Sequence, residues 1–211
     1  RLVQPFRTRS AMFRLGRALR SIETVGRRWA DDRPIGAMID SFDRRLEAIP
    51  SLSQEDLSAL KSRVRRSYAG AGESARWIAS HGDVSPTNVL IDGKGLGLID
   101  FSWSLAPPGH GVFQLSTRLA FQRPQYRRWT LGVERQLVNG YLHESPDPSR
   151  DSYALDLCRL NGWLRMIEYR RPERPPRQWA EQMVRLMATN RLPISARFLV
   201  NSSTSRHHDE G

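Results

Sequence analysis

Three polar side chains in the middle of the chain are of the types that hold a metal ion or accept a proton. Asp83, Asn88 and Asp100 lie in the stretch SHGDVSPTNVLIDGKGLGLIDFSWS, which runs from Ser80 to Ser104. Carboxylate and amide oxygens are the ligands that Mg²⁺ prefers, and a carboxylate can also accept a hydroxyl proton. The residue types therefore indicate a hard-cation site beside a general base.

The residues around these side chains predict short strands. Three apolar runs are bounded by polar residues or glycine: 76–80, 88–92 and 96–101. Antiparallel pairing of the last two runs about the turn at 93–95 brings Asn88 and Asp100 to the same end of the ribbon. Asp83, in the preceding loop, would face the same space. The arrangement suits phosphoryl transfer, in which a metal ion neutralises phosphate charge and a carboxylate orients the attacking hydroxyl.

This stretch resembles the signature of the aminoglycoside phosphotransferase-like small-molecule kinases, a branch of the protein-kinase-like fold. The pattern is H-G-D, four residues, N, and an apolar hairpin that ends in I-D-F or I-D-W. The matching residues are His81, Gly82, Asp83, Asn88, Ile99, Asp100 and Phe101. Weaker similarity in VFQLSTRL and VNGYL extends the likeness over about residues 75–145. Protein kinases have Lys and Gly where this chain has Ser85 and Ser102, so the small-molecule branch fits better.

The resemblance implies a role for each matching polar residue. Asp83 would be the catalytic base, Asn88 and Asp100 would hold Mg²⁺ that bridges the phosphates of ATP, and His81 would support the loop. The implied activity is transfer of the γ-phosphate of ATP to a hydroxyl group of a small molecule. The alternative is a non-catalytic protein, either a remnant of the fold or a basic module that contacts anionic partners.

Three features depart from the family pattern. The chain has no glycine-rich phosphate cover and no paired lysine, because Lys61 falls in a helical pattern and Lys94 in the hairpin turn. We therefore expect the C-terminal lobe without the N-terminal β-lobe. Residues 1–211 alone would then have little or no kinase activity, although a longer parent protein would be a kinase. Gln114 replaces the Asp that usually braces the catalytic loop, and PPGHG replaces the usual D-P near it.

Apolar residues at three- and four-residue steps predict seven helices outside the central block. They cover residues 12–29, 35–49, 51–68, 112–121, 128–142, 152–169 and 176–192. Ser51 or Ser53 is the expected N-cap of the third. The predicted fold is mainly α with a small central β-hairpin. We expect one helical kinase-like lobe over residues 1–200, with the catalytic loop and metal-binding hairpin at 80–104, and a disordered tail at 201–211.

Charge and cysteine content narrow the function classes. The net charge is +11, and Lys61 and Lys94 are the only lysines among 33 basic residues. Arginines on the first helix are expected on a solvated face: Arg14, Arg17, Arg20, Arg27 and Arg28. Aromatic residues do not interleave with arginine, which disfavours a nucleic-acid surface. The only cysteine, Cys158, reads as a core residue and favours a cytoplasmic setting. No apolar run is long enough to span a membrane.

The expected partners are a nucleotide and a small molecule that carries a hydroxyl group. The resemblance implies that residues 125–190 would contact and select the substrate. The net positive charge of the chain disfavours a strongly cationic antibiotic as that substrate. Acidic residues there are expected to be solvated rather than to contact substrate: Glu134, Glu144, Asp147, Asp151, Asp156, Glu168 and Glu181. Trp163, Trp179 and Tyr169 are expected in the core rather than in an aromatic pocket.

Overall fold

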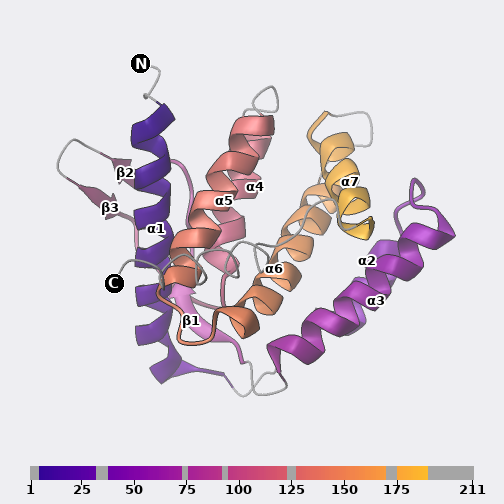
Figure 1. Ribbon diagram of the computed structural model, residues 1–211, viewed down its shortest axis with the longest axis horizontal. Coiled ribbons are helices and arrows are strands. Elements are labelled where there is room, and N and C mark those ends of the chain that lie inside the picture. Colours follow the sequence, from indigo (N-terminus) through magenta and orange to yellow (C-terminus); the bar gives the residue numbers. More distant parts are fainter. Residues whose placement is uncertain are drawn as a thin grey trace, which may run out of the picture.

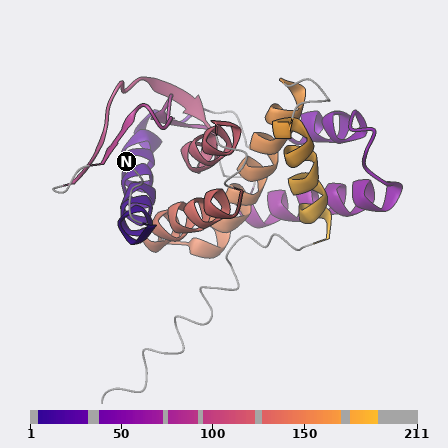
Figure 2. The same cartoon turned by 90° about the horizontal axis from the view of Figure 1, so that it is seen from above.

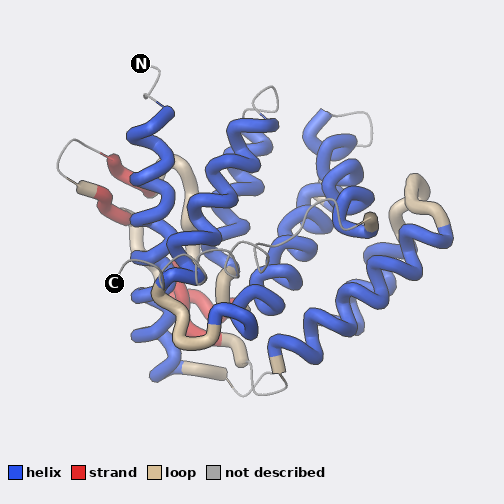
Figure 3. The backbone as a smooth tube through the Cα atoms, viewed as in Figure 1, coloured by secondary structure: helices blue, strands red, loops and turns tan. Residues whose placement is uncertain are grey.

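In the part of the chain that the structure describes, the fold consists of seven α-helices and two small antiparallel sheets of two strands each (Figures 1 and 3). The computed structural model describes residues 5–31, 38–72, 76–91, 95–122, 127–169 and 175–189. In chain order the elements are α1 (Pro5–Gly26), the 3₁₀ turn η1 (Arg27–Trp29), α2 (Ile39–Glu47), α3 (Gln54–Ala71), β1 (Ile78–His81), β2 (Val89–Ile91), β3 (Leu96–Leu98), β4 (Trp103–Ala106), α4 (His110–Gln122), α5 (Arg127–His143), α6 (Pro148–Glu168) and α7 (Pro175–Ala188). The predicted mainly α fold is confirmed, while the expected tail at 201–211 lies outside the described residues.

Helix α6 lies at the centre, between two groups of helices (Figures 1 and 2). On one side α1, α4 and α5 enclose an apolar core that also takes Val84 from the loop after β1. On the other side α2, α3 and α7 pack on α6 around Phe42, Trp163 and Trp179. Because α6 contributes buried side chains to both cores, it holds the two groups in a fixed arrangement.

The ends of the helices follow from capping residues and close contacts. Ser53 is the N-cap of α3: its hydroxyl accepts the backbone N–H of Asp56, whose carboxylate accepts the N–H of Ser53. Helices α1 and α5 approach so closely that a Cβ added at Gly16 would lie 2.1 Å from the carbonyl oxygen of Leu137. Glycine is therefore required where these two helices cross.

The second ribbon corrects the prediction of a single hairpin. Trp103–Ala106 forms β4 and pairs antiparallel with β1, so that His81 lies opposite Trp103 and Ile78 opposite Ala106. The pairing joins segments separated by more than twenty residues, and no local turn motif signals such a contact. Tertiary packing therefore decides that this segment is a strand.

Several charged residues that we expected in solvent are buried. Arg20, Glu134, Asp151 and Asp156 are each less than one-tenth exposed. They form ion pairs between helices: Arg20 with Asp151 at 2.7 Å, Arg63 with Asp156 at 2.6 Å, and Arg159 with Glu134. The solvated interpretation is wrong for these four because each finds an opposite charge on a neighbouring helix.

The aromatic residues of α6 and α7 differ in their surroundings. Trp163 and Trp179 are buried and meet edge to face, with ring centroids 5.2 Å apart, which confirms them as core residues. Tyr169 is exposed, so its assignment to the core is wrong. Cys158 is buried as expected, and burial raises the pKa of its thiol. Within the part of the chain that the structure describes, no helix has both the length and the apolarity to cross a membrane.

Candidate functional site

The predicted catalytic residues lie where the two ribbons meet. Strand β1 leads into the loop 82–88, which carries Asp83 and Asn88 before β2 begins. Strand β3 leads into the loop 99–102, which carries Asp100 before β4 begins. In β2 and β3, Val89 lies opposite Leu98 and Ile91 opposite Leu96, which confirms the predicted hairpin, although β3 ends at Leu98 and not at Phe101.

Backbone hydrogen bonds join these two loops. Gly82 donates its N–H to the carbonyl oxygen of Ser102 at 2.6 Å, and Ile99 donates to the carbonyl oxygen of Asn88 at 3.0 Å. Because Asp100 directly follows Ile99, it lies at the same end of the ribbon as Asn88. The backbones of the two loops are therefore held together as one unit.

His81 links the loops through its side chain. The buried imidazole accepts the backbone N–H of Asp83 at Nδ1, 3.1 Å away, so the ring proton is assigned to Nε2. From Nε2 the ring reaches the carbonyl oxygen of Ile99 at 3.3 Å. The ring of Phe101 packs edge-on against it, with centroids 4.6 Å apart. These contacts describe a supporting residue with both nitrogens engaged.

Glycine at position 82 has a steric reason. A Cβ added there would lie 2.8 Å from Oγ and 2.9 Å from the carbonyl oxygen of Ser102. Any larger residue would push apart the two loops that the Gly82 N–H joins. The glycine between His81 and Asp83 thus permits the close approach of the backbone at this junction.

Asp83 is held by partners on both of its carboxylate oxygens. Oδ2 accepts a hydrogen bond from Nδ2 of Asn88 at 2.9 Å, and Oδ1 forms an ion pair with Arg118 of α4. Sequence reasoning missed Arg118. The available signal was its spacing: it follows Gln114 by one helical turn on α4, so the two side chains lie on one face.

Gln114 braces the loop 82–88 although it carries no charge. Its Oε1 accepts the N–H of Val84 at 2.8 Å, and its Nε2 donates to the carbonyl oxygen of Gly82 at 3.2 Å. An amide can satisfy a donor and an acceptor at once, whereas a carboxylate can only accept. The amide of Gln114 therefore keeps the loop attached to α4.

Asn88 and Asp100 carry an amide oxygen and a carboxylate, the donor types that a hard cation prefers. Asn88 is buried and directs Nδ2 to both the carbonyl oxygen and Oδ2 of Asp83. Its Oδ1 accepts a long hydrogen bond from the hydroxyl of Thr87 at 3.4 Å, and an amide oxygen has a second lone pair for a cation. Asp100 is exposed at the adjacent loop. Among the described residues, no group of three or more His, Cys, Asp and Glu side chains could hold a metal ion. This donor set suits Mg²⁺, which retains water and phosphate ligands, better than Zn²⁺.

The backbone at Asp100 departs from the strand before it. Its φ is +54°, the only positive φ at a non-glycine residue in the described chain. This left-handed conformation is energetically costly for an L residue and is most accessible to Asn, Asp and Gly. In a regular strand Asp100 would point to the face opposite Ile99, so the unusual conformation changes the direction of its carboxylate.

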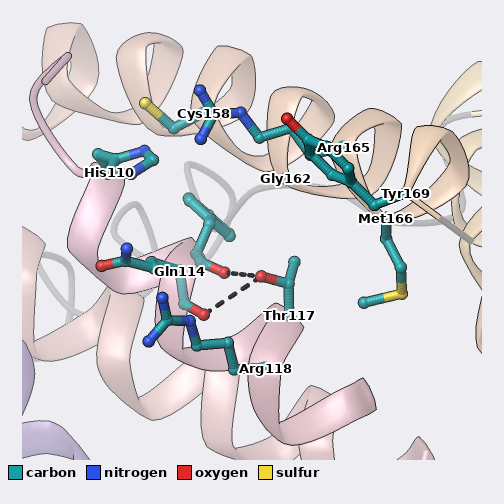
Figure 4. Close-up of a pocket in the computed structure, with 10 residues that line it drawn as sticks. His110, Gln114, Thr117, Arg118, Cys158, Gly162, Arg165, Met166 and Tyr169 are labelled. Atoms are coloured by element: carbon teal, nitrogen blue, oxygen red, sulfur yellow. Dashed lines mark hydrogen bonds between the residues drawn. The ribbon is translucent and has the colours of Figure 1, made fainter. Parts of the chain in front are cut away.

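A pocket adjoins Asp83 on the side of Arg118. It has a volume of about 270 Å³ and lies between α4 and α6 (Figure 4). Helix α4 contributes His110, Gln114 and Arg118, α6 contributes Arg165, and Tyr169 at the C-cap of α6 completes this wall. The pKa of His110 is lowered to about 4, first by burial and then by the charges of Arg165 and Arg118. The imidazole is therefore neutral at neutral pH.

Comparison with known proteins found no match to this chain. No model of a known protein family matches the chain, and no curated protein sequence matches it. The functional interpretation consequently depends on the residues and contacts of the site itself.

Proposed function

We propose that this chain carries the catalytic loop and metal-binding residues of an ATP-dependent kinase that phosphorylates a hydroxyl group of a small molecule. The observation that carries the proposal is the junction of the two loops. Three contacts, from Gly82 to Ser102, from Ile99 to Asn88 and from His81 to Ile99, hold Asp83 and Asn88 next to the segment of Asp100. The resemblance of residues 80–104 to the small-molecule kinase signature supports the same conclusion.

Each residue has a role in the proposed reaction. The substrate oxygen forms a bond to the γ-phosphorus, the bond from that phosphorus to the β-γ bridging oxygen breaks, and ADP leaves. Asp83 orients the hydroxyl group and accepts its proton. Oδ1 of Asn88 and the carboxylate of Asp100 would hold Mg²⁺, which neutralises charge on the phosphates when it is bound. His81 and Gln114 keep the loop in position through the contacts described above.

We also propose that efficient transfer needs phosphate contacts from a second lobe. Large apolar side chains near the site are exposed: Leu90, Ile91, Ile99, Phe101, Trp103 and Leu105. A surface of this kind is typical of a face that another part of a protein covers. Losing even one group that stabilises transition-state charge commonly costs roughly a hundredfold in rate. Residues 1–211 alone are therefore expected to turn over ATP very slowly.

Nucleotide binding tests the proposal without requiring turnover. A non-hydrolysable ATP analogue is titrated into ¹⁵N-labelled protein with and without Mg²⁺. The expected result is Mg²⁺-dependent shifts of the amides in the loops 82–88 and 99–102. Asp100→Asn, which keeps the shape but removes the charge, should weaken Mg²⁺-dependent binding by roughly tenfold or more.

The matched control is Asp40→Asn, which removes an exposed carboxylate from the first turn of α2. It should leave nucleotide binding unchanged. Equal losses in both variants, or binding that ignores Mg²⁺, would contradict the kinase proposal. Binding of polyanions that falls steeply with salt and ignores Asp100 would instead favour the basic module.

A further inference from the structure

The pocket between α4 and α6 is positively charged although it adjoins a proposed catalytic acid. None of the residues that line it is Asp or Glu, while Arg118 and Arg165 enter it from opposite helices (Figure 4). His110 adds no positive charge because its imidazole is neutral at neutral pH. Arg165, together with Arg118 and its partner Asp83, therefore determines the charge of the cavity.

We propose that this pocket binds an acidic group of the substrate, a carboxylate or a phosphate, between Arg118 and Arg165. The inference rests on the proposed kinase function and names the class of hydroxyl compound that this kinase would phosphorylate. Guanidinium groups donate paired hydrogen bonds that match the oxygens of both kinds of anion. Such a substrate differs in charge from cationic aminoglycosides.

Arg165 is available for an anion. Its side chain is exposed on α6, and within the described part of the chain it makes no ion pair or side-chain hydrogen bond. The buried arginines of this protein behave differently, since Arg20, Arg63 and Arg159 each meet a carboxylate. Arg165 is thus a free cation on the wall of a cavity.

Arg118 connects the pocket to Asp83. It lines the cavity and pairs with Oδ1 of Asp83, and about two-fifths of each side chain is exposed. An ion pair this exposed contributes a factor of about five or less to an equilibrium constant. An incoming anion can therefore replace Asp83 as the partner of Arg118. The exchange would free the Asp83 carboxylate for the substrate hydroxyl at the moment the substrate binds.

The rest of the pocket restricts the size of the ligand. Its volume of about 270 Å³ falls just below the range of about 300 to 1,000 Å³ that is usual for drug-sized ligands. Phe113 and Met166 supply apolar surface beside the charged groups. The geometry therefore favours a small hydroxylated acid over a large polycationic one.

A titration without ATP or Mg²⁺ tests the inference. Protein with ¹⁵N-labelled arginine is titrated with inorganic phosphate or gluconate at constant ionic strength, and the Nε–H signals of Arg118 and Arg165 are followed. Sorbitol is the uncharged control, because it matches gluconate except for a CH₂OH in place of the carboxylate. We expect saturable shifts of both arginine signals with an anion and none with sorbitol. The tighter of the two anions identifies the acid type.

Three variants separate this site from general attraction to a basic protein. Arg165→Gln should weaken binding of the better anion roughly tenfold, as expected for loss of a charge-assisted contact. Arg66→Gln, which removes an exposed arginine of α3, should leave binding unchanged. Asp83→Asn should tighten binding by up to about fivefold, because Arg118 loses its internal partner.

Three results would contradict parts of this proposal. Equal weakening by Arg165→Gln and Arg66→Gln, or equal binding of sorbitol and gluconate, would overturn the anion site. Weaker anion binding in Asp83→Asn would overturn the exchange at Arg118. Mg²⁺-dependent nucleotide binding that responds to Asp100→Asn would still support the kinase proposal, so failure of the pocket and failure of the function can be told apart.

Discussion

Two regions of this molecule differ in how they place apolar and charged side chains. In the helical half, which comprises α2, α3, α6 and α7, large apolar side chains such as Trp163 and Trp179 are fully enclosed. In the hairpin region, residues 78–106, Trp103 and Leu90 are each about half exposed. The helical half therefore has the packing of a stable core, whereas the hairpin region carries an unusually apolar surface.

Charged groups show the same contrast. Asp156 in the helical half is buried and accepts from Nε and Nη2 of Arg63 and from the hydroxyl of Ser67, so both of its oxygens have internal partners. Asp83 in the hairpin region is part-exposed, and its partner Arg118 also faces a pocket. We infer that the buried carboxylates of this protein stabilise the fold. The part-exposed carboxylates, whose partners can be exchanged, are the candidates for binding or catalysis.

Removal of one carboxylate charge from each region should give the largest difference. Asp156→Asn leaves the guanidinium of Arg63 buried without an opposite charge, and we expect a loss of about 3–5 kcal/mol in the free energy of unfolding. Asp100→Asn removes an exposed charge and keeps a residue that tolerates positive φ, so it should change stability by about 0.5 kcal/mol or less. Urea unfolding measures both. Similar losses would show that the contrast does not hold.

Two glycine-to-alanine substitutions should change the free energy of unfolding in opposite directions. Gly82→Ala should cost about 1–3 kcal/mol, because the added methyl group collides with Ser102 and separates the two loops. Gly132→Ala, in the interior of α5, should stabilise the protein by about 0.5–1 kcal/mol, since its Cβ meets no atom within 4 Å. Thermal and urea unfolding provide the measurement. A neutral Gly82→Ala would mean that the junction is looser than the contacts indicate.

The pH dependence of the free energy of unfolding tests two titratable groups that lie in neither region, one on α4 and one on α1. His110, at the start of α4, has a pKa lowered from 6.5 to about 4 in the folded protein, so the unfolded chain binds its proton first as pH falls. The stabilising contribution of neutral His110 is thus complete above pH 6.5 and is lost as pH falls through 4. Glu23 acts in the opposite direction. Burial raises its pKa to about 7, and its contribution is lost as pH rises from 4.5 through 7.

The variant His110→Gln separates these opposing effects. Relative to this variant, the wild-type protein should lose stability between pH 6.5 and pH 4, by at most about 1.4 kcal/mol per pH unit. Unfolding free energies at half-unit pH steps provide the comparison. A difference between the two proteins that stays constant across this range would contradict the lowered pKa of His110.

Local patterns allowed much of the fold to be predicted. Apolar spacing indicated the seven helices, Ser53 was one of two expected caps, and the glycine turn with alternating residues indicated β2 and β3. Strand β4 was missed because its partner β1 is distant in the sequence. The positions of buried arginines were also missed. An arginine on an amphipathic helix has the same local signature whether it faces solvent or a carboxylate on another helix.

The sequence alone determined which residue types lie near one another along the chain: a histidine, glycine, aspartate and asparagine before a short hairpin, and a second aspartate at its end. Only the tertiary structure decided that Gln114 holds the backbone on both sides of Asp83, that Arg118 pairs with Asp83, and that Arg118 and Arg165 line one pocket. The physical reason is the separation along the chain of the residues that interact. Turns, caps and helical periodicity depend on residues a few positions apart, whereas the partner of a charge depends on which helices pack together.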